Sequence, residues 1–426
     1  MEFKASKYNI YLIEGNKFYI FNQLTNALSE FEEDLFYVIK NNEISEKKIS
    51  NEEKDFLLSS NFLCDYELQE ELIMLQRNRI RRYGNHHIRL TIMPTLNCNF
   101  RCWYCYEGHI ASKMDSQTID KIISFVNKLI LSSKISLFEL GWFGGEPLMY
   151  FEDVMYPIAK YIKKLCNKEK IRFRHSITTN GYLISDKTME RMNEIELNNF
   201  QITLDGSKEF HNKSRFAQDD KNTYDTIIKN ITNLCRQISN VGITVRINYS
   251  PKNLPYISQI ADSFPEDIRK NLRINPQIIW QYKEGVNEIT SKVFEQLSIF
   301  AQKGYDVENI YMPSSRGIGC YTENMLQYVV NYDGLLYKCT ARNFDNKYSI
   351  GYLNEDGEHV SNANYYNYFM SSFFENPSCL KCEVLPSCAG MCIQKKIENS
   401  LPFCPKESIY NSVIGQVRLI IQQRNT

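Results

Sequence analysis

The sequence lacks long apolar runs and an excess of charge of either sign. No stretch reaches the roughly 18 consecutive apolar residues that a membrane-spanning helix needs, so no membrane association is predicted. The 50 Lys and Arg residues balance the 50 Asp and Glu residues, whereas a general nucleic-acid-binding chain normally shows a strong basic excess. These absences argue against a membrane protein and against a nucleic-acid-binding protein.

The N-terminus also lacks the basic start and apolar core of a secretory signal peptide. The chain nevertheless contains 13 cysteines, and ten of them fall into two groups. Reduced thiols that hold a cluster or a metal in the cytoplasm fit this pattern better than disulfides do. We therefore expect a cytoplasmic location. The remaining cysteines, Cys64, Cys166 and Cys235, lie among apolar residues and are predicted to be core.

The first cysteine group directly follows an apolar run, residues 88–93, that predicts a strand. Cys98, Cys102 and Cys105 have the spacing C-x3-C-x2-C, and no second C-x2-C pair of the kind typical of zinc sites follows nearby. A four-iron, four-sulfur cluster takes four ligands. Three thiolates therefore leave one iron for a small molecule or for a ligand from elsewhere, with a zinc loop or three unrelated thiols as the alternatives.

From residue 88 onward, apolar strands alternate with amphipathic helices. The predicted strands are residues 88–93, 137–143, 173–178, 200–204, 242–248 and 272–279. Helices are predicted between them, for example over residues 116–131 and 222–236. This pattern predicts an α/β fold in which a parallel sheet curves as a partial (β/α)6 barrel. Active groups on such sheets gather at the carboxyl ends of the strands, where the three-cysteine loop is expected.

The ends of the next three strands carry glycines and polar side chains. Gly144-Gly145-Glu146-Pro147 follows the second strand; its glycines let backbone approach a ligand, and its carboxylate can accept from an ammonium group. The third strand ends in Thr178-Thr179-Asn180. The fourth ends at Asp205, followed by His211 and by Arg215, whose planar guanidinium suits a carboxylate. Each feature alone is typical of a turn, but together they predict one site.

The first 85 residues predict a small α+β domain. Residues 8–13 and 18–21 read as two strands of a hairpin, and Ser29 is positioned to cap a following helix. Ser50 and Glu53 form the capping box of a second helix. We therefore expect three domains, at residues 1–85, 86–310 and 311–426.

Residues 311–426 have few long periodic segments but are rich in cysteine. The seven cysteines are Cys320, Cys339, Cys379, Cys382, Cys388, Cys392 and Cys404. Such a density in a cytosolic chain indicates metal. Two zinc sites of four cysteines would need eight thiols, so one four-cysteine site and one three-cysteine site are the natural division, with zinc as the alternative to iron-sulfur.

Three features of the sequence resemble the radical S-adenosylmethionine (SAM) superfamily. They are the first cysteine group with Tyr104, the motif from Gly144 to Pro147, and the polar residues at the ends of the next strands. The pattern Cys320-x13-Gly334-x4-Cys339, followed by five cysteines, resembles its SPASM extension. The resemblance covers residues 86–426. It implies a [4Fe-4S] cluster on the loop cysteines whose fourth iron binds SAM. Reductive cleavage of SAM then yields a 5′-deoxyadenosyl radical that abstracts a hydrogen from a substrate.

The same resemblance implies roles for individual residues. Glu146 is expected to contact the SAM amino group and Arg215 the SAM carboxylate. Tyr104 is expected to contact adenine through its backbone, and residues 178–180 or Asp205 are expected to contact the methionine or the ribose.

In the extension, the resemblance implies two auxiliary [4Fe-4S] clusters, three clusters in all. The outer cluster would be held by Cys379, Cys382, Cys388 and Cys404, and the inner one by Cys320, Cys339 and Cys392. Fully ligated relatives have a further cysteine shortly after the position of Cys320, but residues 321–338 contain none. The inner cluster is therefore expected to have an open iron.

Residues 1–85 resemble, more weakly, the winged-helix-like leader-peptide recognition domains of radical SAM enzymes that modify ribosomally made peptides. Such domains accept the leader as an added strand at a sheet edge. A domain that merely packs on the barrel is the alternative.

The expected function is that of a peptide maturase, which closes a thioether or carbon-carbon crosslink in a precursor peptide and takes electrons from a donor such as ferredoxin or flavodoxin. One alternative is an enzyme like the anaerobic sulfatase maturases, which form formylglycine. Those enzymes have a catalytic Asp directly after the cysteine matching Cys339, where this chain has Thr340. The other alternative is a non-catalytic iron-sulfur scaffold that binds peptides.

Overall fold

The computed structural model describes residues 2–45, 48–279, 281–282, 286–307, 319–341, 344–398 and 404–424, with the side chains of α9 described from residue 292 onward. The chain forms two compact units. The terminal unit comprises Met1–Tyr83, Glu308–Glu323 and Ser371–Thr426, and the barrel unit comprises Gly84–Val307 and Asn324–Met370. Within the described ranges, no helix has the length and apolar character to cross a membrane.

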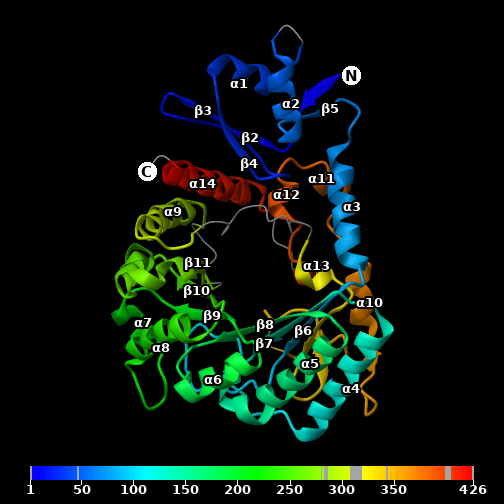
Figure 1. Ribbon diagram of the computed structural model, residues 1–426, viewed down its shortest axis with the longest axis vertical. Helices are drawn as coiled ribbons and strands as arrows, with labels where there is room; N and C mark the ends of the chain where they lie inside the picture. The colour runs from blue at the N-terminus through cyan, green and yellow to red at the C-terminus, as the bar shows by residue number, and fades with distance from the viewer. Residues whose placement is uncertain are drawn as a thin grey trace. The chain divides into compact units, whose positions relative to one another are not determined.

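Six parallel strands form the predicted sheet of the barrel unit (Figure 1). In chain order they are β6 (His87–Ile92), β7 (Leu137–Trp142), β8 (Arg172–Thr179), β9 (Asn199–Leu204), β10 (Gly242–Tyr249) and β11 (Leu272–Ile278). They lie side by side in the order β11-β10-β9-β8-β7-β6, so the predicted parallel α/β sheet is confirmed. Pro276 in β11 has no backbone N–H to donate to a neighbouring strand. This is tolerated because β11 is an edge strand.

Four further strands extend this sheet beyond β6. They are β12 (Gln327–Val330), β13 (Leu335–Tyr337), β14 (Gly351–Leu353) and β15 (His359–Ser361). β12 runs parallel to β6, and the remaining three strands are antiparallel. Part of the segment 311–426, expected as a separate extension, therefore completes the barrel sheet. All four residues of β12 are buried, and a run of that length carries no periodicity by which to recognise it.

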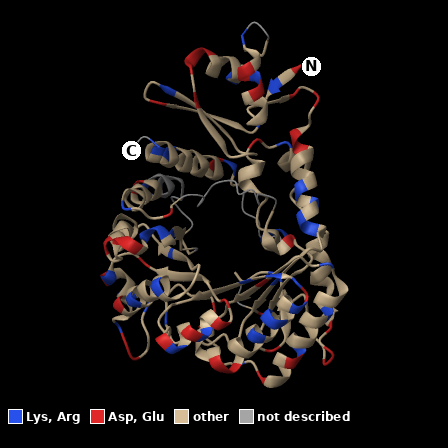
Figure 2. Ribbon diagram, viewed as in Figure 1, with Lys and Arg blue, Asp and Glu red and all other residues tan. Residues whose placement is uncertain are grey.

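The helices of the barrel unit follow its strands. They are α4 (Ser116–Ser132), α5 (Tyr156–Lys168), α6 (Asp186–Glu194), α7 (Lys208–Ser214), α8 (Thr223–Gln237), α9 (Val286–Gln302) and α10 (Ala363–Phe369). Shorter helical turns are η1 (Pro147–Tyr150), η2 (Phe151–Met155), η3 (Leu254–Asp262), η4 (Glu266–Asn271) and η6 (Asn346–Tyr348). Acidic and basic residues are both distributed along these helices (Figure 2).

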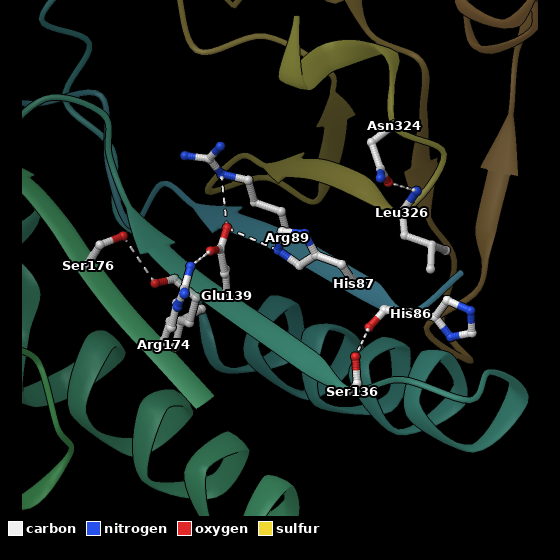
Figure 3. A network of polar contacts seen from close by, with 10 residues as sticks. His86, His87, Arg89, Ser136, Glu139, Arg174, Ser176, Asn324 and Leu326 are labelled. Atoms are coloured by element: carbon white, nitrogen blue, oxygen red, sulfur yellow. Dashed lines mark hydrogen bonds and ion pairs between the residues drawn. The ribbon is translucent and has the colours of Figure 1, made fainter. Parts of the chain in front are cut away.

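One face of the central strands is apolar and the other polar, as in β7, where Phe138 and Leu140 are buried and Glu139 is half-buried. Glu139 lies in register between Arg89 and Arg174 (Figure 3). Its carboxylate accepts from Arg174 at 3.0 Å and lies 3.0 Å from His87 Nε2. Burial favours a raised pKa for Glu139, but His87, Arg89 and Arg174 together hold that pKa at about 2. The interactions of Glu139 therefore connect the three neighbouring parallel strands β6, β7 and β8.

A buried histidine joins β7 to β8 and predicts a pH dependence of stability. Trp142 Nε1 donates to His175 Nε2 at 2.6 Å, and His175 Nδ1 donates to the Ile195 carbonyl at 2.9 Å. Burial lowers the pKa of His175 from 6.5 to about 4. The unfolded chain therefore takes up a proton before the folded chain does, and stability falls as the pH drops from about 6.5 to 4.

Between pH 7 and pH 5, His175 alone should lower the free energy of unfolding by about 2 kcal/mol. Urea unfolding of iron-free protein at the two pH values measures this loss. In His175→Gln, the loss of unfolding free energy between pH 7 and pH 5 should be smaller than in wild type by about 2 kcal/mol. An identical pH dependence of stability in the two proteins would show that His175 does not cause it. Burial also lowers the pKa of His211, but His211 is present in both proteins and contributes equally to each.

The terminal unit contains the N-terminal α+β segment. Its elements are β1 (Phe3–Ala5), β2 (Asn9–Glu14), β3 (Lys17–Asn22), β4 (Ala27–Phe31), α1 (Glu33–Lys40), α2 (Asn51–Ser59), β5 (Leu63–Asp65) and α3 (Glu70–Tyr83). The capping box of Ser50 and Glu53 is confirmed. The prediction that Ser29 caps a helix is wrong: Ser29 lies in β4 opposite Ile20, and α1 begins at Glu33. Pairing of residues 27–31 with β3 overrides the local capping signal.

The terminal unit also contains several helical segments from later in the chain, of which the last covers one face of this sheet. They are η5 (Tyr321–Glu323), α11 (Pro377–Leu380), α12 (Leu385–Cys388), α13 (Ile393–Ile397) and α14 (Lys406–Arg424). Val413 and Val417 of α14 pack against Ile10 and Phe21 of the sheet β2-β3-β4. Ile20 and other residues of the opposite face pack against α1 and α2. The two ends of the chain therefore share one folded unit.

Candidate active site

The three-cysteine loop connects β6 to α4 at the carboxyl ends of the parallel strands, as predicted. Since β6 lies between β7 and β12, this loop leaves from the interior of the sheet rather than from an edge. Cys98 and Cys102 are half-buried, and Cys105 is exposed.

Several predicted ligand cysteines accept a hydrogen bond at sulfur from the backbone N–H two residues later. The donors are Phe100 to Cys98 at 3.3 Å, Ala341 to Cys339 at 3.4 Å, Glu107 to Cys105 and Gly390 to Cys388. These N–H groups favour the thiolate, which is the form that binds metal. Burial acts in the opposite direction and raises the pKa of the Cys98, Cys105 and Cys388 thiols. Hydrogen bonds to sulfur are a recurrent feature of iron-sulfur ligation, so these loops fit such a cluster.

Two glycines after β7 allow close contact with the backbone of the three-cysteine loop. A Cβ on Gly145 would lie 1.9 Å from the Asn97 carbonyl oxygen, and one on Gly144 would lie 2.8 Å from that of Thr95. Both glycines have positive φ, and Glu146 N donates to Asn97 O at 2.9 Å. Sequence reasoning predicted that the glycines approach a ligand; in the structure they approach the cysteine loop itself.

The Glu146 carboxylate is fully buried and already holds three donors. Oε1 accepts from Thr179 Oγ1 at 2.7 Å and from Leu148 N at 3.0 Å, and Oε2 accepts from Asn180 N at 2.8 Å. Burial raises the pKa of Glu146, and these donors oppose the rise. Through these hydrogen bonds Glu146 connects the ends of β7 and β8, in addition to any contact that it makes with a ligand.

Asn180 connects the end of β8 to the first cysteine. Its Nδ2 donates to Asn99 Oδ1 at 2.8 Å and lies 3.9 Å from Cys98 Sγ. Thr179 is buried against Glu146, whereas Thr178 is half-buried and lies beside Gln201 in the sheet. Of the predicted series at this strand end, Thr179 and Asn180 thus belong to the connected polar network.

Tyr104 is the hub of a second buried network. Its hydroxyl donates to Asp205 Oδ2 at 2.7 Å and accepts from Arg215 Nη1 at 2.7 Å and from Asn248 Nδ2 at 3.1 Å. The Tyr104 carbonyl, part of the backbone expected to meet adenine, accepts from Gln281 Nε2 at 3.0 Å. One phenol therefore gathers groups from the ends of β9, α7 and β10.

This second network has unused hydrogen-bonding atoms in its interior. Asp205 Oδ1, Arg215 Nε and His211 Nε2 are buried without a hydrogen-bond partner among the described residues. Burial raises the pKa of Asp205, and Arg215 opposes that rise. Buried polar groups are normally satisfied, so an acidic and a cationic side chain with spare capacity fit a ligand that carries a carboxylate together with hydroxyl or ammonium groups, as SAM does.

The segment around Cys339 is fixed on both sides within the barrel unit. Before it, the ammonium of Lys338, which is 1% exposed, donates to the carbonyls of Asn324, Met325 and Gln327 at 2.7, 3.1 and 2.9 Å. After it, the Thr340 carbonyl accepts from the Tyr106 hydroxyl at 3.0 Å. Tyr106 directly follows Cys105, so this bond connects two cysteine-bearing segments.

The terminal unit holds the remaining predicted ligands. Cys379, Cys382, Cys388 and Cys404 all belong to this unit, and burial together with the charges of Cys404 and Cys382 raises the pKa of the Cys379 and Cys388 thiols. Cys320 and Cys392 belong to this unit and Cys339 to the barrel unit. In the part of the chain that the structure describes, no three Cys, His, Asp or Glu side chains are arranged around a single-ion position.

Sequence reasoning missed three residues of the site. Asn248 is the penultimate residue of β10 and donates a hydrogen bond to Tyr104, and Asn253 Nδ2 donates to the carbonyls of Asp205 and Asn248 at 3.1 and 3.2 Å. Glu107 accepts from Gly145 N, and burial raises the pKa of Glu107 to about 7. The strand-end rule, applied to β10 as to β7, would have found Asn248.

The fold and the site define an α/β-barrel protein whose chemistry lies at the carboxyl edge of its parallel strands, around a three-cysteine loop. Residues 92–263 match the family model of the Radical SAM superfamily. This part of the chain is therefore a radical SAM domain, and the radical SAM fold implies SAM and a [4Fe-4S] cluster.

Two curated proteins are similar over most of the chain. The radical SAM cyclopropyl synthase TigE of Paramaledivibacter caminithermalis is 24% identical over 93% of this chain and 92% of its own length. The cysteine-type anaerobic sulfatase-maturating enzyme of Clostridium novyi is 24% identical over 71% of this chain and 87% of its own length.

Two solved structures share the fold. The structure of anSMEcpe with bound AdoMet and Cp18Cys peptide aligns with a TM-score of 0.62 over 80% of this chain and 99% of that chain, at 18% identity. Streptococcus suis SuiB bound to precursor peptide SuiA aligns with a TM-score of 0.52 over 93% of this chain and 97% of that chain, at 14% identity. The α/β fold with a partial-barrel sheet is thus shared with these proteins.

Proposed function

We propose that this enzyme is a peptide maturase that removes two hydrogens from a ribosomally made precursor peptide and closes a new covalent bond. The observation that carries the proposal is the division of the cysteines. Three cysteines lie on one loop at the carboxyl ends of the barrel strands, and Cys379, Cys382, Cys388 and Cys404 belong to the unit that also holds the N-terminal sheet. The relative of nearly equal length, a cyclopropyl synthase, favours a carbon-carbon bond over a thioether.

In this proposal Cys98, Cys102 and Cys105 hold the SAM-binding cluster, and the outer and inner cysteine sets hold two auxiliary clusters. When bound, these groups supply a hydrogen-abstracting centre and an acceptor for the second electron. The chain itself positions the reactants. Arg215 and Asp205 offer their unused atoms to the carboxylate and to the hydroxyl or ammonium groups of SAM. Glu146 and Asn180 fix the loop that carries the cluster.

The N-terminal sheet is the proposed site for the leader of the precursor. β2 and β4 are its two edges, and a peptide can add to such an edge through backbone hydrogen bonds. SuiB was solved with its precursor peptide and anSMEcpe with a peptide, which supports a peptide substrate here. A low-potential donor such as ferredoxin or flavodoxin is the proposed source of electrons.

Mass spectrometry tests the proposed function. The chain is co-produced anaerobically with each small peptide encoded beside its gene, and a loss of two hydrogens per bond is expected. Formation of formylglycine on a sulfatase-type peptide would favour the sulfatase-maturase alternative instead. If reconstituted protein releases no 5′-deoxyadenosine from SAM and reductant, the scaffold alternative is favoured.

Arg215→Gln should weaken SAM binding about 10- to 100-fold, because a hydrogen bond to a charged group contributes roughly 1.5–3 kcal/mol. Equilibrium dialysis of SAM against anaerobically reconstituted protein measures the dissociation constant. Arg191→Gln is the matched control, since Arg191 is paired at the surface with Glu152. Equal affinities in the two variants would show that Arg215 acts only within the protein.

A further inference from the structure

Gln23 connects the N-terminal sheet to the four-cysteine segment. It follows the last residue of β3 and is 2% exposed. Its Nε2 donates to the carbonyls of Tyr8 and Glu383 at 3.2 and 3.0 Å, and its Oε1 accepts from the Ser387 hydroxyl. Glu383 directly follows Cys382 and Ser387 directly precedes Cys388. One buried amide thus holds both ends of the segment between two predicted ligands.

Apolar packing reinforces this connection. Tyr8 and Leu24, which flank the sheet, are buried in one cluster with Met74, Phe374 and Leu385. Leu385 lies between Cys382 and Cys388 in sequence and is 1% exposed. The cysteine segment therefore packs on the N-terminal elements through a buried core as well as through Gln23.

The fourth cysteine of the set reaches the same sheet through α14. Cys404 lies just before α14, whose first residue, Lys406, pairs with Glu383 at 2.6 Å. Farther along α14, Arg418 pairs with Glu14 of β2 at 2.6 Å, and Arg424 donates to the Leu28 carbonyl of β4 at 3.2 Å. The helix that begins next to the cysteine set thus contacts both edge strands of the sheet.

We propose that Gln23 is a positioning residue for the outer cysteine set, and that cluster loading at this set is thermodynamically linked to the order of the sheet β2-β3-β4. A bound cluster would restrict the motion of the segment between Cys382 and Cys388, which Gln23 and α14 contact. Restricting this segment stabilises the sheet β2-β3-β4, and ordering the sheet stabilises the segment in turn. By reciprocity, a leader bound at the sheet edge favours the loaded state. This last consequence rests on the proposed function, whereas the link between cluster and sheet does not.

The test uses the full chain, iron and sulfide, and hydrogen exchange at β3 and β4. Gln23→Met keeps the length of the side chain but removes its hydrogen bonds, and Gln69→Met is the matched control because Gln69 is exposed. After anaerobic reconstitution, Gln23→Met should lose iron to a chelator about tenfold faster than wild type. Cys382→Ser should make the sheet amides exchange about tenfold faster.

A double-mutant cycle separates linkage from ordinary destabilisation. In the Gln23→Met background, Cys382→Ser should accelerate exchange of the sheet less than threefold, because the connection is already broken. Fully additive effects, or iron retention equal to that of Gln69→Met, would overturn the proposal. These outcomes are measured without peptide, so they are distinguishable from a failure of the proposed function, which would appear as an unmodified precursor.

Discussion

Gly145→Ala should remove the iron of the three-cysteine loop, about four iron atoms per chain, and abolish 5′-deoxyadenosine formation. A methyl group at this position would lie 1.9 Å from the Asn97 carbonyl oxygen, and the obstacle is backbone that has no alternative rotamer. Accommodating the methyl group requires separating the loop after β7 from the cysteine loop. Iron analysis after reconstitution, combined with chromatography of SAM cleavage products, measures both effects.

Gly304→Ala is the control for this prediction. Gly304 also has positive φ, +84°, but its added Cβ would meet nothing within 4 Å. The control should cost about 1–2 kcal/mol of backbone strain and leave the iron content unchanged. Retention of the loop iron by Gly145→Ala would show that the cluster loop does not depend on this close approach.

Lys338→Met should lower the free energy of unfolding by about 1–3 kcal/mol, because it removes a buried donor that serves three backbone carbonyls, of which that of Gln327 is itself buried. The ammonium also lies 5.2 Å from the centre of the Tyr328 ring and 5.7 Å from that of Phe369. Methionine retains the packing of the side chain but none of these polar interactions. Denaturant unfolding of iron-free protein measures the loss without a contribution from clusters.

Lys347→Met is the matched control for Lys338→Met. Lys347 is largely exposed and lies 3.7 Å from Asp345, so its replacement should change the free energy of unfolding by less than about 0.5 kcal/mol. Similar losses for the two variants would show that the carbonyl cage around Lys338 contributes little.

Much of the barrel could be predicted from the sequence because its strands are buried and regularly spaced. The predicted run 137–143 corresponds to β7, and the predicted helix 116–131 corresponds to α4, capped by Asp115. The strand-end rule also placed Glu146, Asn180 and Asp205 at the carboxyl edge of the sheet. These predictions rest on periodicity, which burial of one face imposes on a local stretch of sequence.

Contacts between distant segments could not be predicted in the same way. β12 is only four residues long, and its place beside β6 depends on pairing rather than on its own pattern. Gly145 reads as a turn glycine until the carbonyl of Asn97 is placed beside it. Similarly, Gln23 is an ordinary polar residue in sequence, and its role depends on Glu383 and Ser387 far along the chain.

The position of β12 beside β6 has a consequence for how the enzyme is made. β6 and the cysteine loop leave the ribosome early, but their second neighbour in the sheet is synthesised only after β11 and α9. The N-terminal sheet likewise gains its cover, α14, only after residues 406–424 have been synthesised. Such long-range closures are slow and leave apolar edges open during synthesis. Iron-sulfur insertion is therefore expected to follow the synthesis of α14, and production yields should depend on chaperones that protect the unpaired edge of β6.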